Sequence, residues 1–409
     1  MVKLDIDVID KLFDNGVELL SNVNELFELE LALLEYNNLP KENLLDRTAY
    51  IKSIYGEYSK HYLFCSTVSE KIQNGRSLYT RLYFSEGQFS TGYATHGLFP
   101  YHGKFHPQLI RALLNILGVR RGDTILDPMA GSGTTNIEAS LLGINSLAID
   151  ISPFCQFMIQ VKYESLLINK EKLAEINLDE KDLFTFFNKN EALDKISKFE
   201  DIEKQKIYRL AFLAWLDALG YSKRVVRSNH EQLFSKVLMR YLETVKSFVN
   251  NPLYSQNDIG KVTVLSCDAL NMNIPDNSID CVITSPPYSF AINYVENDKS
   301  QLDIMGFDAD KLKEKMIGLK GKDKDEKINI YFNDIEKLCA ETSRVIKSGK
   351  YIVIIIGSNT IQTGGVRLEN CVIGSAKQNK MQLVKMIRKP IRGMRNTMKD
   401  EFILIFRRH

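Results

Sequence analysis

The residues most suggestive of chemistry are Ser285, Pro286, Pro287 and Tyr288, which follow the apolar run 278–283. Together they can present a hydroxyl, a fixed carbonyl and an aromatic ring to one planar amino group. Such an amine is a poor nucleophile because its lone pair is delocalised into the ring. The Ser285 hydroxyl and the Pro286 carbonyl can each accept one amine hydrogen, and the two prolines fix the backbone. Tyr288 would stack on the ring that carries the amine. The alternative is a tight loop in which Tyr288 only packs.

A second candidate site is the glycine-containing loop from Asp127 to Thr135, which also follows an apolar run. Its glycines at 131 and 133 allow a ligand to approach the backbone closely, and the helix expected next offers free amides. The dinucleotide fingerprint is incomplete because position 136 is Asn, and no Gly-Lys-Ser/Thr phosphate loop is present. Asp127 would repel a phosphate but attract a cationic amino-acid group. We therefore interpret the loop as the seat of a nucleoside cofactor with a cationic tail.

Three carboxylates, Asp127, Asp150 and Asp268, are expected at the ends of three consecutive strands. Asp150 stands where a carboxylate accepts hydrogen bonds from both ribose hydroxyls of a nucleoside. Asp268 is placed to accept a hydrogen bond from an adenine amino group. Each acid by itself could equally be a helix cap or a turn former. With the glycine-containing loop, the three together predict S-adenosylmethionine as the cofactor.

These side chains must be positioned by a sheet whose strands alternate with helices. The segment 124–150 has the pattern strand, loop, helix, strand, which is one βαβ unit. Residues 351–356 are almost all Ile and Val, as in a central strand covered on both faces. The pattern predicts an α/β fold. The remaining strands are expected at 262–265, 278–283, 383–390 and 401–406.

Helical spacing dominates two segments outside these strands. Residues 1–88 are predicted to form a helical accessory region. Residues 156–258 are predicted to form a helical insertion, because the halves of one sheet flank this segment. The catalytic domain is then split into 89–155, which would bind the cofactor, and 259–409, which would carry the catalytic turn and complete the sheet. The charged run 308–327 is expected to be a solvated loop.

Composition limits the class of protein. The chain has 409 residues, 44% hydrophobic and 25% charged, as in ordinary globular proteins with a substantial core. No apolar run approaches the roughly 20 residues that span a bilayer, and the acidic amino terminus lacks a secretory signal. We expect a cytoplasmic protein with no membrane partner. The six cysteines form no Cys-x-x-Cys pair, and no carboxylate or cysteine cluster accompanies the loop histidines, so we expect free thiols and no metal.

The two motifs together resemble those of amino-group-directed, S-adenosylmethionine-dependent DNA methyltransferases. The resemblance covers 93–150 and 262–406, about half of the chain. It implies a Rossmann-like, seven-stranded, mostly parallel sheet with a reversed final strand. It also implies that the segment 97–108 closes over the methionine end of the cofactor. The expected cofactor-binding residues are His102, Gly103, Lys104, Phe105, Asp127, Pro128, Ala130, Gly131, Ser132, Gly133, Thr134, Asp150, Ile151, Asp268, Ala269 and Ser285.

The resemblance also bears on the target base. Serine at the first position of the catalytic turn is more typical of cytosine-N4 enzymes, whereas Asp or Asn is more typical of adenine-N6 enzymes. A carbon-5 cytosine methyltransferase would need a cysteine nucleophile, usually within Pro-Cys, and the chain has no Pro-Cys. The predicted activity is methylation of the N4 amine of cytosine in duplex DNA, as in restriction-modification. The alternatives are adenine-N6 methylation of DNA, guanine-N2 methylation of RNA, and a non-catalytic DNA-binding subunit.

Recognition of DNA is expected to come from the insertion, because the motif order leaves no recognition region after Phe406. Residues 204–250 carry 9 Lys/Arg against 3 Asp/Glu. Residues 377–409 are also basic, with 10 Lys/Arg against 2 Asp/Glu. Duplex DNA is the predicted partner, a cognate restriction endonuclease is a second, and the oligomeric state is left open. The residues expected to contact DNA are Lys223, Arg224, Arg227, Arg388, Arg392 and Arg395.

Overall fold

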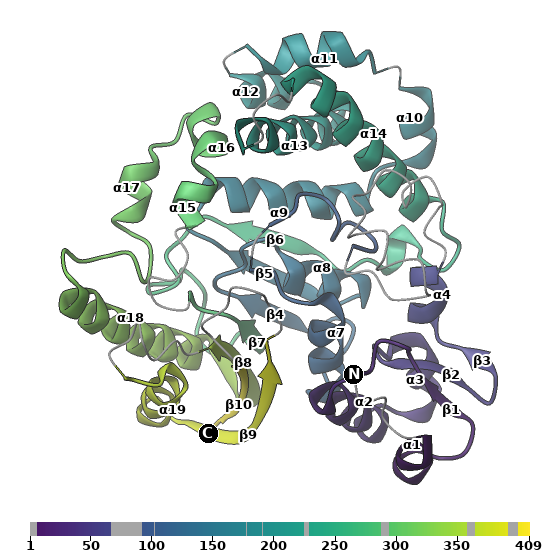
Figure 1. Cartoon of the computed structure of the whole chain (residues 1–409), viewed down its shortest axis with the longest axis vertical. Helices are drawn as coiled ribbons and strands as arrows, with labels where there is room; N and C mark the ends of the chain where they lie inside the picture. The colour runs from purple at the N-terminus through teal and green to yellow at the C-terminus, as the bar shows by residue number, and fades with distance from the viewer. Residues whose placement is uncertain are drawn as a thin grey trace. The chain divides into compact units, whose positions relative to one another are not determined.

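Seven strands form one sheet, in the order β6-β5-β4-β7-β8-β10-β9 (Figure 1). Neighbours from β6 to β8 are parallel, whereas β10 is antiparallel to both β8 and β9. The predicted fold class, a mostly parallel sheet with a reversed final strand, is therefore confirmed. The strands are β4 (Thr124–Asp127), β5 (Asn145–Ile149), β6 (Val262–Leu265), β7 (Ile279–Thr284), β8 (Ile346–Gly357), β9 (Met381–Pro390) and β10 (Asp400–Arg408).

The computed structural model divides into two compact units, and each is described by itself. The described residues are 6–66, 92–101, 103–176, 178–189, 191–224, 229–287, 294–357, 365–391 and 400–409. Unit 1 contains 1–120, 137–143 and 160–260, and unit 2 contains 121–136, 144–159 and 261–409. Unit 1 thus groups the accessory region with most of the insertion. The four predicted domain boundaries stay a prediction.

Unit 2 holds the sheet and its covering helices. The side chains of Ile352–Ile356 in β8 are each at most 1% exposed, as expected for a strand covered on both faces. The helices α18 and α19 pack beside this strand, and their apolar faces join its core cluster. The helices of unit 2 are α15 (Tyr294–Asn297), α16 (Lys299–Ile304), α17 (Ala309–Lys313), α18 (Lys324–Val345) and α19 (Leu368–Gln378). Two helices, α8 (Thr134–Leu141) and α9 (Pro153–Leu166), have residues in both units.

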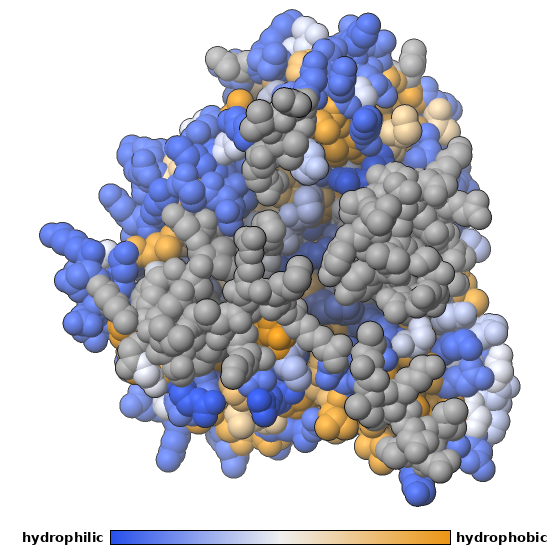
Figure 2. Space-filling view, in the orientation of Figure 1, coloured by the Kyte–Doolittle hydropathy of each residue, from blue (hydrophilic) through white to orange (hydrophobic). Residues whose placement is uncertain are grey.

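The charged run 308–327 differs from the predicted loop, because it contains α17 and the start of α18. Each helix begins at an aspartate that caps it. The Asp308 carboxylate accepts hydrogen bonds from the amides of residues 310 and 311, and the Asp323 carboxylate accepts one from the amide of Glu326. Caps of this kind satisfy free amides and start a helix even where apolar residues are few. The run is nevertheless solvated, and Figure 2 shows a hydrophilic surface over α17.

Unit 1 is mainly helical, as predicted for its two segments, but it also contains a small antiparallel sheet in the order β1-β2-β3. These strands have only two to four residues, too few to show an alternating pattern. Tyr55 and Gly56, between β2 and β3, both have positive φ, which is the backbone twist of a tight hairpin. The elements are α1 (Ile6–Leu12), β1 (Val17–Leu19), α2 (Leu26–Asn38), α3 (Lys41–Arg47), β2 (Ile51–Ile54), β3 (Glu57–Tyr58), α4 (Lys60–Ser66), α7 (Pro107–Ile116), α10 (Lys170–Glu175), α11 (Glu180–Phe187), α12 (Ala192–Ser197), α13 (Ile202–Arg224), α14 (His230–Val249) and η1 (Gln256–Asp258).

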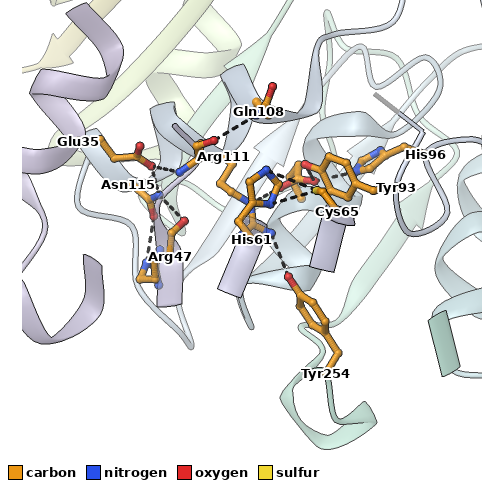
Figure 3. A network of polar contacts seen from close by, with 12 residues as sticks. Glu35, Arg47, His61, Cys65, Tyr93, His96, Gln108, Arg111, Asn115 and Tyr254 are labelled. Carbon is orange, nitrogen blue, oxygen red and sulfur yellow. Dashed lines mark hydrogen bonds and ion pairs between the residues drawn. The ribbon is translucent and has the colours of Figure 1, made fainter. Parts of the chain in front are cut away.

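A buried carboxylate joins the accessory helices of unit 1 to α7. Glu35 of α2 is fully buried and accepts hydrogen bonds from Asn115 Nδ2 at 2.6 Å and from the Ala49 amide at 2.8 Å. Asn115 in turn accepts a hydrogen bond from Arg47 Nε at 3.0 Å. Figure 3 shows this group beside α7. Burial raises the pKa of Glu35. The hydrogen bonds offset the cost of burying this acid and fix α7 to the accessory region.

Among the described residues, no helix combines the length and apolar character required to cross a membrane. The same residues include no group of three or more His, Cys, Asp or Glu side chains arranged to bind a metal ion. The cytoplasmic location stays a prediction.

Candidate active site

The predicted site residues of unit 2 follow four neighbouring strands of the sheet. Asp127 is the last residue of β4, Asp150 directly follows β5, and Ser285 directly follows β7. Asp268 comes three residues after β6. Because β6, β5, β4 and β7 are parallel neighbours, their carboxyl ends share one edge of the sheet. This edge is where open α/β sheets bind ligands. The fold therefore gathers four predicted site residues that lie far apart in the sequence.

The glycine-containing loop is fastened to the end of β5. The Gly131 amide donates a hydrogen bond to Asp150 Oδ2 at 2.8 Å. Gly133 has a φ of +75°, and a Cβ at this position would lie 2.9 Å from Cγ1 of Ile159 on α9. No larger residue fits there without a shift, which explains this glycine. The other loop residues predicted to bind the cofactor, all buried, are Pro128, Ala130, Ser132 and Thr134.

Asp150 keeps room for a ligand despite its two backbone partners. Oδ2 accepts from the Gly131 amide and Oδ1 accepts from the Ser152 amide, each at 2.8 Å. The Cys155 side chain also hydrogen-bonds to this carboxylate, and the lone pairs that these partners leave can accept from a ligand. Burial raises the pKa of Asp150 to about 6, although these amides oppose the rise. Ile151, the next predicted residue, is half-buried.

Asp127 is a buried acid whose carboxylate lies beside the side chains of Thr135 and Thr284. Its side chain is 1% exposed, and Oδ1 accepts a hydrogen bond from the Met129 amide at 3.2 Å. Burial raises the pKa of Asp127 to about 7, although Thr135, the Met129 amide and Thr284 oppose the rise. The two threonines were not among the residues predicted to bind the cofactor.

Asp268 has the conformation of a turn former. Oδ1 accepts a hydrogen bond from the Leu270 amide at 2.9 Å, while the side chain itself is exposed. Ala269 is 8% exposed. The Leu270 amide occupies only one carboxylate oxygen of Asp268. The other oxygen can therefore accept a hydrogen bond from an adenine amino group. That contact stays a prediction.

The catalytic turn is supported by a residue that the sequence did not reveal. Pro286 is buried, and Ser285 and Pro287 are half-buried. The hydroxyl of Tyr331, on α18, donates a hydrogen bond to the Pro287 carbonyl at 2.9 Å. Tyr331 is 1% exposed, so water cannot replace this bond readily. Tyr288 lies outside the described residues. No spacing in the sequence links Tyr331 to the turn, since 44 residues separate it from Pro287.

We expect Tyr331→Phe to lower kcat of methyl transfer about tenfold, while the dissociation constant of S-adenosylmethionine changes less than about twofold. The variant loses one buried hydrogen bond, worth about 1.4 kcal/mol, and the Pro287 carbonyl becomes free to move. Steady-state kinetics and calorimetric titration separate the two quantities. Tyr351→Phe, on β8 of the same unit, is the matched control. Equal kcat for the wild type and Tyr331→Phe would contradict the supporting role.

The predicted residues of the cofactor-closing segment belong to unit 1. Gly103, Lys104 and Phe105 are described, and Lys104 Nζ donates a hydrogen bond to the His96 carbonyl at 3.2 Å. His102 lies outside the described residues. The part of these four residues in cofactor binding stays a prediction.

The predicted DNA contacts are only partly described. Lys223 is exposed near the carboxyl end of α13, and Arg224 is the last residue of that helix. Arg388 on β9 is 69% exposed and forms an ion pair with Asp400 at 2.8 Å, which leaves less of its charge for a phosphate. Arg227, Arg392 and Arg395 lie outside the described residues. Contact with DNA stays a prediction for all six.

Two stretches of the chain match known families. Residues 279–409, which contain the catalytic turn, match the family described as DNA methylase. Residues 98–208 match a second family, described as an RMKL-like methyltransferase domain. The predicted cofactor, S-adenosylmethionine, is confirmed, and the DNA methylase match supports the predicted class of amino-methyltransferase.

Three relatives illustrate what the chain is similar to. The type II methyltransferase M.BsoBI of Geobacillus stearothermophilus is 27% identical over 284 residues, which are 56% of this chain and 56% of the relative. The type II methyltransferase M.MjaII of Methanocaldococcus jannaschii is 36% identical over 154 residues, 37% of this chain and 28% of the relative. A tRNA (guanine(10)-N2)-dimethyltransferase of Methanothermobacter thermautotrophicus is 45% identical over 53 residues, 13% of this chain and 16% of the relative. The chain thus spans little more than half of the first relative and less of the others.

Proposed function

We propose that this protein transfers a methyl group from S-adenosylmethionine to the exocyclic N4 amine of a cytosine in duplex DNA. The observation that carries the proposal is the placement of Asp150, Asp127 and Ser285 at the ends of the neighbouring strands β5, β4 and β7. Two acids for the cofactor and one hydroxyl for the amine thus follow the same edge of the sheet. This edge supplies both halves of a methyl-transfer site.

The acids at the strand ends fit the cofactor chemically. The free acceptor positions of Asp150 suit the two ribose hydroxyls. The buried carboxyl of Asp127 suits a cationic group, and with a cation nearby it would ionise at neutral pH. The amide of Leu270 holds Asp268 at the turn after β6, beside β5, for an adenine amine. The donor cofactor supplies an electrophilic methyl group on a sulfonium.

The catalytic turn supplies the acceptors for the amine. The Ser285 side chain and the Pro286 carbonyl would each accept one amine hydrogen, which favours a pyramidal nitrogen with its lone pair free for attack. The nitrogen–carbon bond forms as the carbon–sulfur bond breaks, and the bonding electron pair leaves with the sulfur. The amine proton then departs along the hydrogen bond to Ser285 towards solvent. Tyr331 keeps the turn in place through the Pro287 carbonyl.

Two other targets compete with cytosine N4. Adenine N6 needs the same acceptors, and the first residue of the turn, serine, is what favours cytosine. Guanine N2 in RNA is supported by the local similarity to a tRNA (guanine(10)-N2)-dimethyltransferase. The similarity to two type II methyltransferases favours DNA, and a cognate restriction endonuclease would be the matching partner. The basic half of the insertion would bind the duplex.

One experiment distinguishes these targets. The protein is incubated with labelled S-adenosylmethionine and either mixed-sequence duplex DNA or structured RNA, and the digested nucleosides are identified by mass. We expect N4-methylcytosine from DNA. N6-methyladenine would move the target to adenine, and N2-methylguanine from RNA would overturn the proposal. No methylated nucleoside from either substrate would favour a non-catalytic DNA-binding subunit.

Binding of the cofactor should weaken as the pH falls. Because burial raises the pKa of Asp127 to about 7 and that of Asp150 to about 6, both carboxyls become protonated in mildly acidic solution. A bound cation favours the ionised forms, so binding must then release protons. We expect the dissociation constant of S-adenosylmethionine to rise about tenfold to twentyfold between about pH 8 and about pH 6.

Calorimetric titration across this pH range measures the effect. Asp127→Asn, which cannot ionise, should bind more weakly at about pH 8 and lose most of the pH dependence. Asp123→Asn, at the amino end of β4, should behave as the wild type does. A wild-type affinity that does not change with pH would contradict the placement of a cation beside Asp127.

A further inference from the structure

A loop of unit 1 has a backbone that residues with a side chain rarely adopt. Ala94 and Phe99 have φ values of +49° and +59°, and both side chains are buried. Gly97, between them, packs so closely that a Cβ would lie 2.8 Å from the Gly92 carbonyl oxygen. Such conformations persist only where surrounding contacts hold them, and they concentrate at ligand clamps and switch regions. The loop 93–101 must therefore be held by its neighbours in unit 1.

The first part of the loop is held by a buried carboxylate of α8. The Tyr93 hydroxyl and His96 Nε2 bond to Glu138 Oε1 at 2.5 and 2.7 Å, and Arg111 Nε of α7 donates to Glu138 Oε2 at 2.9 Å. Figure 3 shows Tyr93, His96 and Arg111 within one network of polar contacts. Burial alone would raise the pKa of Glu138, but Arg111 and His96 lower it to about 2, so it stays ionised.

The second part of the loop is held by the helical insertion. The Phe99 amide donates a hydrogen bond to the Tyr241 hydroxyl at 2.7 Å, and that hydroxyl donates to Asp217 Oδ2 at 3.0 Å. The Tyr241 hydroxyl has a single hydrogen, which it donates to Asp217, and its oxygen accepts from the Phe99 amide. Arg240 pairs with the same oxygen of Asp217 at 2.8 Å. Tyr241 is fully buried on α14, and Asp217, on α13, is 5% exposed.

We propose that Tyr241 is a positioning residue that couples the α13–α14 hairpin to cofactor binding. The hydroxyl holds Phe99 in its left-handed conformation, four residues before Gly103, and the inference rests on the predicted part of residues 103–105 in cofactor binding. The exposed Lys223 lies on α13 beyond Asp217, so duplex DNA that contacts this end of the helix acts on the same hairpin. DNA and S-adenosylmethionine then change each other's affinity by the same factor.

The protein contains an intrinsic fluorescence probe of the α13–α14 hairpin. Trp215 is its single tryptophan, 1% exposed, and lies two residues before Asp217 on α13. We expect S-adenosylmethionine to change the emission of Trp215 in the wild type. In Tyr241→Phe, which keeps the ring and removes the hydroxyl, we expect the dissociation constant of S-adenosylmethionine to rise about tenfold. We expect kcat at saturating cofactor to stay within about twofold, and the emission response to be lost.

Tyr208→Phe, on the same helix α13, is the matched control and should preserve both affinity and response. Circular dichroism establishes that each variant is folded. A second measurement needs no variant: the affinity of the wild type for S-adenosylmethionine is measured with and without sheared random-sequence duplex DNA. We expect it to differ by at least about threefold.

The outcomes separate this inference from the proposed function. If the wild type does not bind S-adenosylmethionine, the proposed function fails and the coupling with it. If the wild type binds and methylates, the coupling is overturned when Tyr241→Phe keeps wild-type affinity and emission response. It is also overturned when duplex DNA leaves the wild-type cofactor affinity unchanged. A loss of cofactor affinity in Tyr241→Phe equal to that in Tyr208→Phe would indicate a structural effect without coupling.

Discussion

Replacing Ser285 by alanine is expected to lower kcat of methyl transfer by about a hundredfold to a thousandfold, with the dissociation constant of S-adenosylmethionine unchanged. The reason is that the Ser285 oxygen would accept an amine hydrogen only as the nitrogen becomes pyramidal, so its contribution belongs to the transition state. Removal of one preorganised hydrogen-bond partner of a reacting group typically has an effect of this size. The cofactor acids follow β4, β5 and β6, and they keep their partners in the variant.

Ser278 provides the matched control for this experiment. It lies at the opposite end of the same strand, where its hydroxyl donates a hydrogen bond to the Pro275 carbonyl at 2.7 Å. Ser278→Ala therefore removes the same kind of hydroxyl directly before β7, at the edge of the sheet away from the acids. Its kcat should match that of the wild type. Equal turnover by Ser285→Ala and Ser278→Ala would contradict a catalytic role of the turn.

The central sheet was predictable because its strands have recognisable local sequence patterns. The Ile and Val run of β8 indicates a strand buried on both faces, and the turn after Asp127 separates a strand from a helix. The small sheet of unit 1 was not predictable, since β1, β2 and β3 are too short to establish a period. The helices within 308–327 were hidden for a different reason. Capping aspartates start these two helices, and a prediction from composition alone takes no account of helix caps.

The candidate site likewise has a part that the sequence predicts and a part that it does not. The gathering of the acids and the Ser-Pro-Pro turn at one edge of the sheet was predictable, because each lies at the end of a strand or within three residues after it. Tyr331 and Tyr241 act through single hydrogen bonds to backbone groups, Pro287 and Phe99, that lie far away in the sequence. Nothing in local spacing marks such a contact.

Replacing Asp150 by alanine is expected to raise the dissociation constant of S-adenosylmethionine by at least about a hundredfold. Two charge-assisted hydrogen bonds to the ribose would be lost, each worth about 1.5–3 kcal/mol. The Gly131 amide also loses its acceptor, so the glycine-containing loop is no longer fastened to the end of β5. At saturating cofactor, kcat should fall far less than in Ser285→Ala, because Asp150 would not touch the reacting atoms. Calorimetric titration and initial rates at high cofactor concentration measure the two effects.

Adenosine distinguishes the role of Asp150 from that of Asp127, because it has the ribose but lacks the cationic amino-acid tail. Asp150→Ala should weaken the binding of adenosine and of S-adenosylmethionine alike, whereas Asp127→Asn should weaken only the latter. Asp123→Ala, at the amino end of β4, should weaken neither. Unchanged adenosine binding in Asp150→Ala would show that this carboxylate does not bind the ribose. The cofactor would then have to approach the sheet edge with its amino-acid end towards β5, and Asp127, at the end of β4, would not face the cation.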